Sequence, residues 1–466
     1  MDLLTPSCRE YSRNRARCRA VPAMRMRIMK ATDERGETLG LAELVAIGIG
    51  GMIGGGIFSV LGLAVDITGN AAPLAFAIGA VIAAFAGHSY IRLALTFRSD
   101  GASYTFLEYA FPAHPNIGGF IGWVVVLGYI GTLALYAFTF AAYGADMLGN
   151  PDRAPLRFFL TGFILLFFMI VNLLGTRASG HTEDVIVYAK VAILALVAVI
   201  GLWTIDVDHL LPVASKGVPS IFAAGAVIFV AYEGFQLITN AVTESEIPER
   251  NVPRGIYTAV AVVATVYILL AIVGVGNLTP QEIRTAEEYA LAVAVEPVLG
   301  DAGRFVIGIA AVLATASAIN ATIFGASHMM AVMATEKMMP KPFSHRSRRD
   351  TPAVAIVVLT ALALLFAATG GLQMIAAFSS MTFLVVSLAV SVANWKLRAK
   401  TGAKSWVVIG GILFMLAAFG ELVVYMWETE RERLLIALGL YLAVLVAELA
   451  FSKRRLLFRP RTGEAP

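Results

Sequence analysis

Cysteine and histidine are scarce in this chain of 466 residues, which has two cysteines and six histidines. Cys8 and Cys18 both lie in a basic stretch before the first apolar run, where we favour free thiols over a disulfide. The histidines form no His-x-x-His or Glu-x-x-His pattern, so we expect no bound metal and no cofactor. A membrane enzyme, which would need metal ligands or a nucleophile–base pair, is therefore disfavoured.

Charge is also sparse, because only 15% of the residues are charged and 58% are hydrophobic. The mean hydropathy of +0.77 excludes an ordinary water-soluble protein. Twelve apolar segments are long enough to cross the roughly 30 Å hydrocarbon core of a bilayer, which predicts an all-α integral membrane protein with 12 transmembrane helices. The predicted spans lie at 40–66, 73–97, 117–148, 157–175, 183–204, 219–242, 254–276, 303–335, 352–370, 372–395, 404–427 and 433–452.

The 36 lysines and arginines are divided unevenly between alternate loops. The side that holds both termini receives 27 of them, and the opposite side receives five. Because positive loops remain in the cytoplasm, this asymmetry predicts a multi-pass protein of the cell membrane with both termini cytoplasmic. It also explains the net charge of +4 without a nucleic-acid partner. We expect residues 1–39 to be a disordered basic leader and 453–466 to be a cytoplasmic tail.

Glycine interrupts the first predicted span at its centre. The stretch from Ile47 to Leu61 reads IGIGGMIGGGIFSVL, with six glycines in nine positions. A glycine inside a helix costs about 1 kcal/mol relative to alanine, so this cluster should break the helix at mid-membrane. Irregular backbone is tolerated at that depth only inside protein or beside a cavity. Close packing between helices is the alternative reason for such glycines.

The sixth predicted span carries a second interruption at Glu233-Gly234. The two interrupted spans are five apart, so the second set of five would enter the membrane in the opposite orientation. This pattern indicates an inverted-repeat transporter with its site at the two breaks. The predicted organisation is a first repeat at 40–204, a second at 219–395, and two added helices at 404–452.

Several short motifs along the first eight spans resemble those of amino acid–polyamine–organocation (APC) transporters, and the chain looks similar to the proton-coupled amino acid transporters of that superfamily. The motifs are GGMIGGGIF at 50–58, YIRLALTFRSDGASY at 90–104, NLLG at 172–175, FVAYEGF at 229–235 followed by ESEIPERNVP at 244–253, and SAIN at 317–320 followed by GASH at 325–328. The resemblance implies a five-plus-five inverted repeat of the LeuT type, with helices 1 and 6 broken.

An amino acid needs donors for its carboxylate and oxygens for its ammonium. The unpaired N–H groups at an interrupted helix suit the carboxylate, and Gly54, Gly55 and Gly56 also match the family's carboxylate-binding turn. Carbonyl groups at the broken ends suit the ammonium. Tyr129, Tyr136, Phe229 and Tyr232 are candidates for aromatic gates. The predicted substrate-binding residues are Gly50, Gly51, Ile53, Gly54, Gly55, Gly56, Phe229, Val230, Tyr232 and Glu233.

Two ionisable residues lie inside predicted spans. Glu233 either lines the site, where it would contact a cation or exchange a proton, or caps the broken helix. Lys190 has no acid at i±3 or i±4 and suits a proton carrier, with snorkelling to the headgroups as the alternative. The resemblance implies that its ammonium occupies the position of sodium in sodium-coupled relatives. Its expected partners are the carbonyls of 48–51 and Thr315 or Ser317.

The sequence thus predicts a secondary active transporter that imports amino acids by proton symport through alternating access. The alternative is an amino acid or polyamine exchanger without net proton movement, and a channel is a third class that would lack matched broken helices. The expected partners are a small-molecule substrate, a proton and the lipid bilayer. The small residues near the breaks suit a small or medium neutral side chain, while Glu233 leaves a cationic one open.

Overall fold

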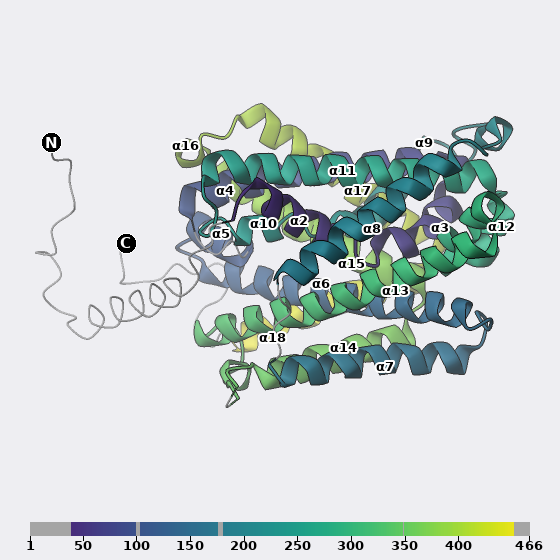
Figure 1. Cartoon of the computed structure of the whole chain (residues 1–466). Coiled ribbons are helices and arrows are strands. Elements are labelled where there is room, and N and C mark those ends of the chain that lie inside the picture. Colours follow the sequence, from purple (N-terminus) through teal and green to yellow (C-terminus); the bar gives the residue numbers. More distant parts are fainter. Residues whose placement is uncertain (1–38, 99–102, 176–179, 348, 452–466) are drawn as a thin grey trace, which may run out of the picture. The chain divides into compact units, whose positions relative to one another are not determined.

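The computed structural model describes residues 39–98, 103–175, 180–347 and 349–451. Nearly all of the predicted leader and the whole predicted tail lie outside the described residues. The chain forms two units, Met1–Leu39 and Gly40–Pro466, and the description below concerns the second. In the described part of this unit, every regular element of three or more residues is a helix (Figure 1).

The longer helices carry the apolar segments of the sequence. They are α2 (Leu41–Met52), α3 (Gly56–Thr68), α4 (Ala72–Phe97), α6 (Pro115–Met147), α7 (Ala154–Leu173), α8 (Gly180–Gly201), α9 (Val218–Val227), α11 (Pro248–Asn277), α13 (Ala290–Thr335), α14 (Ala353–Thr369), α15 (Leu372–Lys396), α17 (Ser405–Thr429) and α18 (Arg431–Phe451). The short elements are η1 (Gly69–Ala71), α5 (Ser103–Ala110), η2 (Val207–Leu210), η3 (Ile228–Tyr232), α10 (Leu237–Asn240), α12 (Pro280–Ala286), η4 (Glu287–Tyr289), η5 (Lys341–Ser344) and α16 (Arg398–Thr401).

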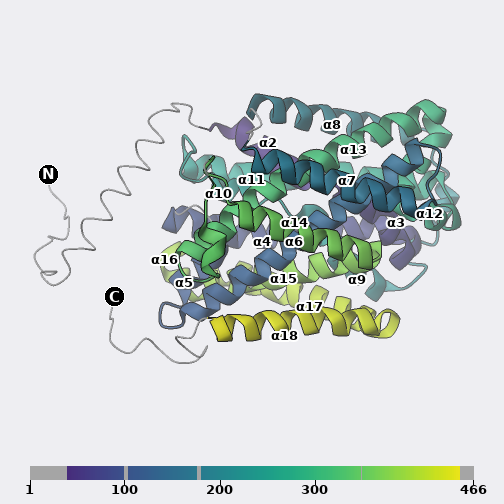
Figure 2. The same ribbon diagram turned by 90° about the horizontal axis from the view of Figure 1, so that it is seen from below.

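Eight segments among the described residues are long and apolar enough to cross a membrane. Three shorter apolar helices accompany them, at Leu41–Met52, Val187–Gly201 and Ala353–Thr369. The long helices run side by side, with α7 against α14 in Figure 1 and α17 against α18 in Figure 2. The chain is therefore a multi-pass membrane protein.

The helix α6 is a central packing element, because it contacts α13, α15, α7 and α14. Its glycines allow these neighbours to approach closely, as is usual where helices pack inside a membrane. A Cβ added at Gly128 would lie 2.8 Å from the ring of Phe383, and one at Gly131 would lie 2.3 Å from the Ser379 hydroxyl. α6 is thus closely packed against its neighbours, beside the interrupted helices.

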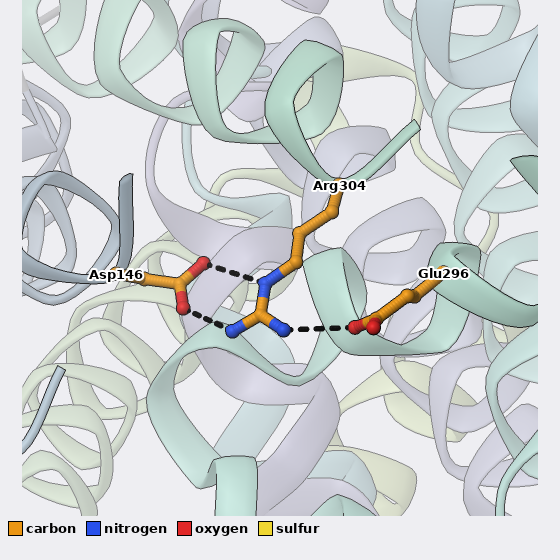
Figure 3. Close-up of polar contacts among 3 residues, drawn as sticks. All are labelled: Asp146, Glu296 and Arg304. Carbon is orange, nitrogen blue, oxygen red and sulfur yellow. Dashed lines mark hydrogen bonds and ion pairs between the residues drawn. The ribbon is translucent and has the colours of Figure 1, made fainter. Parts of the chain in front are cut away.

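An ion network fixes the end of α6 against α13 (Figure 3). The Arg304 guanidinium donates two hydrogen bonds to the Asp146 carboxylate, one of them at 3.2 Å, and a third to Glu296 at 2.8 Å. The Asp146 side chain is only 2% exposed, so its pairing with Arg304 is shielded from solvent, where such pairs are stronger than at the surface. One turn earlier on α6, the Tyr143 hydroxyl donates to the Phe58 carbonyl of α3 at 2.8 Å.

The helix α13 is interrupted near the predicted start of its span, and α11 begins earlier than predicted. α13 leaves helical geometry at Gly300, where φ is 65°, so the helical segment after this kink begins close to the predicted 303, and a separate segment from Ala290 precedes it. α11 starts at Pro248 rather than 254, because a proline fits the first turn of a helix. Before α13, Thr279 and Glu282 cap the start of α12 reciprocally, and the hydrogen bonds from Thr279 hold the pKa of the Glu282 carboxyl below its usual value.

Candidate functional site

The first break separates α2 from α3 at Ile53, Gly54 and Gly55, inside the glycine cluster that predicted it. The Ile53 N–H still bonds the Ile49 carbonyl, but Gly54 turns back to the Met52 carbonyl at 2.9 Å. α3 then starts afresh at Gly56. Among the described residues, no acceptor bonds the amide N–H groups of 55–58. These donors form a positive helix end buried at the centre of the molecule.

Glycine is required in this break by its neighbours. A Cβ at Gly55 would lie 2.6 Å from the Tyr136 ring and 3.2 Å from the Thr315 methyl group. A Cβ at Gly54 would lie 2.9 Å from Ala318. Tyr136, which the sequence predicts as a candidate gate aromatic together with Tyr129, Phe229 and Tyr232, therefore lies directly on the glycine turn. The gating role itself stays a prediction.

The second break runs from Ile228 to Gln236 and joins α9 to α10. It consists of the 3-10 helix η3, an extended residue at Glu233, and Gly234 with φ of 135°. Ser380 of α15 satisfies the backbone here, because its hydroxyl accepts from the Val230 N–H at 2.8 Å and donates to the Val227 carbonyl. Phe229 and Tyr232 are buried, and the Tyr232 hydroxyl donates to the Phe76 carbonyl of α4 at 2.9 Å.

The two breaks touch each other through their backbones. A Cβ on Gly234 would lie 2.4 Å from the carbonyl carbon of Gly51, and one on Gly56 would lie 2.7 Å from the Cα of Ala231. Tyr267 of α11 bonds both breaks, since its hydroxyl lies 2.9 Å from the Met52 carbonyl and 3.3 Å from the Ala231 carbonyl. The predicted residues of both spans thus form one buried unit.

Lys190 lies at the first break. Its Nζ donates to the Ile53 carbonyl at 2.5 Å and to the Gly50 carbonyl at 3.3 Å, and the residue is only 4% exposed. These carbonyls are at the C-terminal end of α2, which carries partial negative charge and stabilises a buried cation. The ammonium therefore binds backbone oxygens inside the protein, whereas a snorkelling lysine would extend its ammonium to the lipid headgroups.

The other predicted partners of Lys190 are placed differently. The Thr315 hydroxyl donates to the Ala311 and Val312 carbonyls of its own helix, at 2.7 and 3.0 Å, and its methyl group packs against Gly55. Ser317 lies half a turn further along α13 and is half-buried. Of the expected carbonyls at 48–51, Gly50 provides one acceptor, and Ile53 provides the other.

Glu233 is buried beside this unit. Its Oε2 accepts a hydrogen bond from the Gln236 side-chain Nε2 at 2.7 Å, and the side-chain Oε1 of Gln236 accepts from the Gly234 N–H at 2.9 Å. Gln236, not Glu233, thus caps the irregular backbone. The residues that sequence reasoning missed are Tyr267, Ser380 and Gln236. Their only signal is a polar side chain in or beside an apolar segment.

No group of three or more potential metal ligands occurs among the histidine, cysteine and acidic residues of the described ranges. The geometry offers instead a buried amide-rich turn, paired helix ends, one lysine and one carboxylate. Such a site can hold a small zwitterion or an inorganic ion between two broken helices, and it contains no nucleophile–base pair.

Comparisons with known proteins agree with this geometry. Residues 39–446 match the family model described as amino acid permease. The chain is 31% identical to an uncharacterized protein of Methanocaldococcus jannaschii, over 90% of this chain and 96% of that protein. It is also 31% identical to the inner membrane transport protein YbaT of Escherichia coli, over 90% and 97% of the two chains.

A more distant relative is the serine/threonine exchanger SteT of Bacillus subtilis, which is 26% identical over 72% of this chain and 77% of its own. Among solved structures, a manganese transporter mutant of Eremococcus coleocola superposes with a TM-score of 0.57 and 14% identity, covering 88% of this chain and 93% of that chain. That likeness shows the fold alone. The family match confirms the resemblance seen in the motifs, and the chain therefore belongs to the amino acid permease family of the APC superfamily, as a membrane transporter and not an enzyme.

Proposed function

We propose that this transporter imports amino acids together with protons by alternating access. The observation that carries the proposal is the Lys190 ammonium on the Gly50 and Ile53 carbonyls of the first break. A proton that enters or leaves this lysine changes the charge next to the same turn that presents amides for a carboxylate. Substrate and proton would then act on one movable element.

The proposed architecture has twelve membrane helices in a five-plus-five inverted repeat, at 40–204 and 219–395, with two added helices at 404–452. The matched interruptions between α2 and α3 and between α9 and α10 support it, because each opens its repeat. Both termini are proposed to lie in the cytoplasm of the cell, on the basis of the lysine and arginine distribution.

The substrate carboxylate is proposed to bind the amides at the start of α3, where Gly54, Gly55 and Gly56 leave room for close approach. Its ammonium would bind carbonyls from Phe229 to Tyr232 of the second break, and those of Gly50, Gly51 and Ile53 belong to the same surface. Both groups would lie between elements that already touch in this conformation. Binding would therefore have to displace the Tyr136 ring from the glycine turn.

The proton role of Lys190 follows from its surroundings. A buried ammonium needs hydrogen-bond acceptors, and here the end of α2 supplies them. Loss of the proton removes the attraction between the charge and the helix end, so α8 would release the α2 end of the first break. Thr315 and Ser317 of α13 are proposed to lie along the path of this exchange.

A proteoliposome assay tests this mechanism. We expect uptake of labelled amino acids to rise when the outside is acidic and to become insensitive to the pH gradient in Lys190→Met. Lys190→Arg should keep substrate binding but lose uptake, because a guanidinium does not release its proton. The control is Lys216→Met. In the wild type, the Lys216 ammonium donates to the backbone carbonyl of Asp66, outside the breaks. Wild-type gradient dependence in Lys190→Met would refute the proton role.

The second candidate is an exchanger, which is favoured by the relative whose name states serine/threonine exchange. An exchanger would load labelled substrate only into vesicles that already contain unlabelled substrate, with or without a pH gradient. Uptake into empty vesicles that depends on the gradient favours symport. This single comparison separates the two candidates.

A further inference from the structure

We propose that Glu233 binds a positively charged group on the substrate side chain, so that the preferred substrates are amino acids that end in an amine or a guanidinium. The inference rests on the proposed function, because it assumes that an amino acid binds at the two breaks. It goes further in naming the chemical class of that substrate and the residue that selects it.

One carboxylate oxygen of Glu233 accepts a hydrogen bond within the protein, and the other accepts none from the described residues. The residue is 6% exposed, and its Oε2 accepts from the Gln236 amide at 2.7 Å. The Oε1 of Glu233 is buried and accepts no hydrogen bond from any of the described residues. Gln236 is itself fixed by the Gly234 N–H, so the orientation of the carboxylate is set by backbone. The available oxygen is thus held in place rather than mobile.

Tyrosines from two other helices lie in the same region as this carboxylate. The Tyr90 ring of α4 packs edge-on against Phe235, two residues after Glu233, at 5.6 Å between ring centroids, and Tyr129 and Tyr136 of α6 are close enough for their hydroxyls to interact electrostatically with Glu233. The Tyr90 hydroxyl is already bonded to the Ser103 hydroxyl at 2.7 Å, and the Tyr129 ring packs edge-on against Phe383. A carboxylate with aromatic side chains in its vicinity is a combination that binds ammonium and guanidinium groups.

The described ion pairs include none to Glu233. Lys190, the buried cation nearby in the fold, donates to backbone carbonyls of the first break. A charge buried in a membrane protein is costly unless it is paired with an opposite charge. A cationic group on the substrate would supply this opposite charge for Glu233.

Tyr136 connects this position to the proposed carboxylate turn. Its ring lies against Gly54 and Gly55, and the same residue is within electrostatic reach of Glu233. Once the Tyr136 ring has moved off the glycine turn, one substrate could therefore place its carboxylate on the α3 amides and its distal cation at Glu233. A substrate with a neutral side chain would leave Glu233 unpaired. Because a buried polar group without its partner is costly, the site would discriminate strongly between cationic and neutral substrates.

Pairs of ligands that differ in the charge of the side chain test the proposal with the intact protein. Free arginine competes against citrulline, and free lysine against norleucine, for inhibition of labelled substrate uptake in proteoliposomes and for thermal stabilisation in detergent. We expect the charged member of each pair to bind at least about tenfold more tightly to the wild type. Glu233→Gln should bring the two members of each pair within about twofold, whereas Glu233→Asp should keep the preference.

Glu448→Gln is the matched control. Glu448 of α18 is also buried, at 3% exposed, and its Oε2 also has no hydrogen-bond partner among the described residues, but it lies against Gly119 of α6, away from both breaks. This variant should keep the wild-type preference for the charged member.

Three outcomes overturn the inference. The first is a wild type that binds citrulline and norleucine as tightly as their charged partners. The second is a folded Glu233→Gln that keeps the full preference, and the third is an equal loss of preference in Glu448→Gln. In each case the proposed function survives, because amino acids are still transported. A wild type that binds and transports no amino acid at all refutes the proposed function instead.

Discussion

The two breaks are similar in position but are built in different ways. The first, at Ile53 to Gly55, is made by small residues and leaves the amides of the next helix without acceptors among the described residues. The second, at Ile228 to Gln236, has its backbone bonded by side chains, with Ser380 on Val227 and Val230 and Gln236 on Gly234.

This difference separates two tasks. A backbone with available donors can bind a ligand, whereas a backbone bonded by side chains can hold its shape while its neighbour changes. The first break is therefore the part that we expect to respond to substrate, and the second is the part that we expect to keep the pair in register. Three substitutions challenge this division.

The largest effect is expected at the contact between the breaks. Gly234→Ala would place a Cβ 2.4 Å from the Gly51 carbonyl carbon, at a φ of 135° that residues with side chains rarely adopt. Such strain costs on the order of 1–3 kcal/mol even without a collision, and here backbone would have to move. We expect uptake to be abolished and the thermal midpoint in detergent to fall by several degrees, because a loss of 1 kcal/mol lowers the midpoint of a protein domain by roughly 2–8 °C.

Gly420→Ala is the control for this variant, because a Cβ there has no atom within 4 Å among its described neighbours. A Gly234→Ala protein with wild-type uptake and midpoint would show that the two breaks do not need this contact.

A smaller and more selective effect is expected in the first break. Gly55→Ala would place a Cβ 2.6 Å from the Tyr136 ring and 3.3 Å from the Tyr136 Cα. We expect substrate affinity to fall by at least about tenfold, which corresponds to roughly 1.4 kcal/mol, while the protein stays folded and monodisperse. A bulkier residue at this position should abolish binding.

The matched control is Gly325→Ala in α13, where the added Cβ meets open space. The division between the breaks fails if Gly55→Ala binds substrate normally, or if it lowers stability as much as Gly234→Ala does.

The smallest effect on substrate binding and uptake is expected at the side-chain support of the second break, where the change is one of stability. Ser380→Ala leaves the buried Val230 N–H without its acceptor, which costs about 1–3 kcal/mol of stability. The neighbouring Ser379 is equally buried but donates to the Ile375 carbonyl of its own helix, so Ser379→Ala leaves no backbone N–H without its acceptor and should cost less than Ser380→Ala. Thermal midpoints of the two variants in detergent measure the difference. Equal midpoints would mean that Ser380 does not support the break.

The breaks themselves could be predicted from the sequence because their signals are local. Six glycines within nine residues and a glutamate inside an apolar span each identify a position without knowledge of its neighbours. The same is true of Lys190, since a lysine in an apolar span must find acceptors, and the carbonyls of an interrupted helix were the available ones.

The supporting contacts could not be predicted from one sequence. Ser380 lies 150 residues from Val230, and Tyr267 lies 215 residues from Met52. A lone serine or tyrosine in an apolar segment gives no indication of which distant carbonyl it bonds. Ile53 was predicted to bind substrate, but its carbonyl was not predicted as an acceptor for Lys190, because the exact end of α2 depends on local dihedral angles at its C-cap.

Tyr267 has a further consequence for movement. A phenol hydroxyl carries a single hydrogen, yet two carbonyls, those of Met52 and Ala231, lie within its reach. The hydrogen can pass from one acceptor to the other by rotation about the C–O bond. If the two broken helices slide past each other, the bond that is lost on one side can be replaced on the other. Tyr267 would then keep one hydrogen bond throughout the movement, so that the two broken helices could shift relative to each other at nearly constant hydrogen-bond energy.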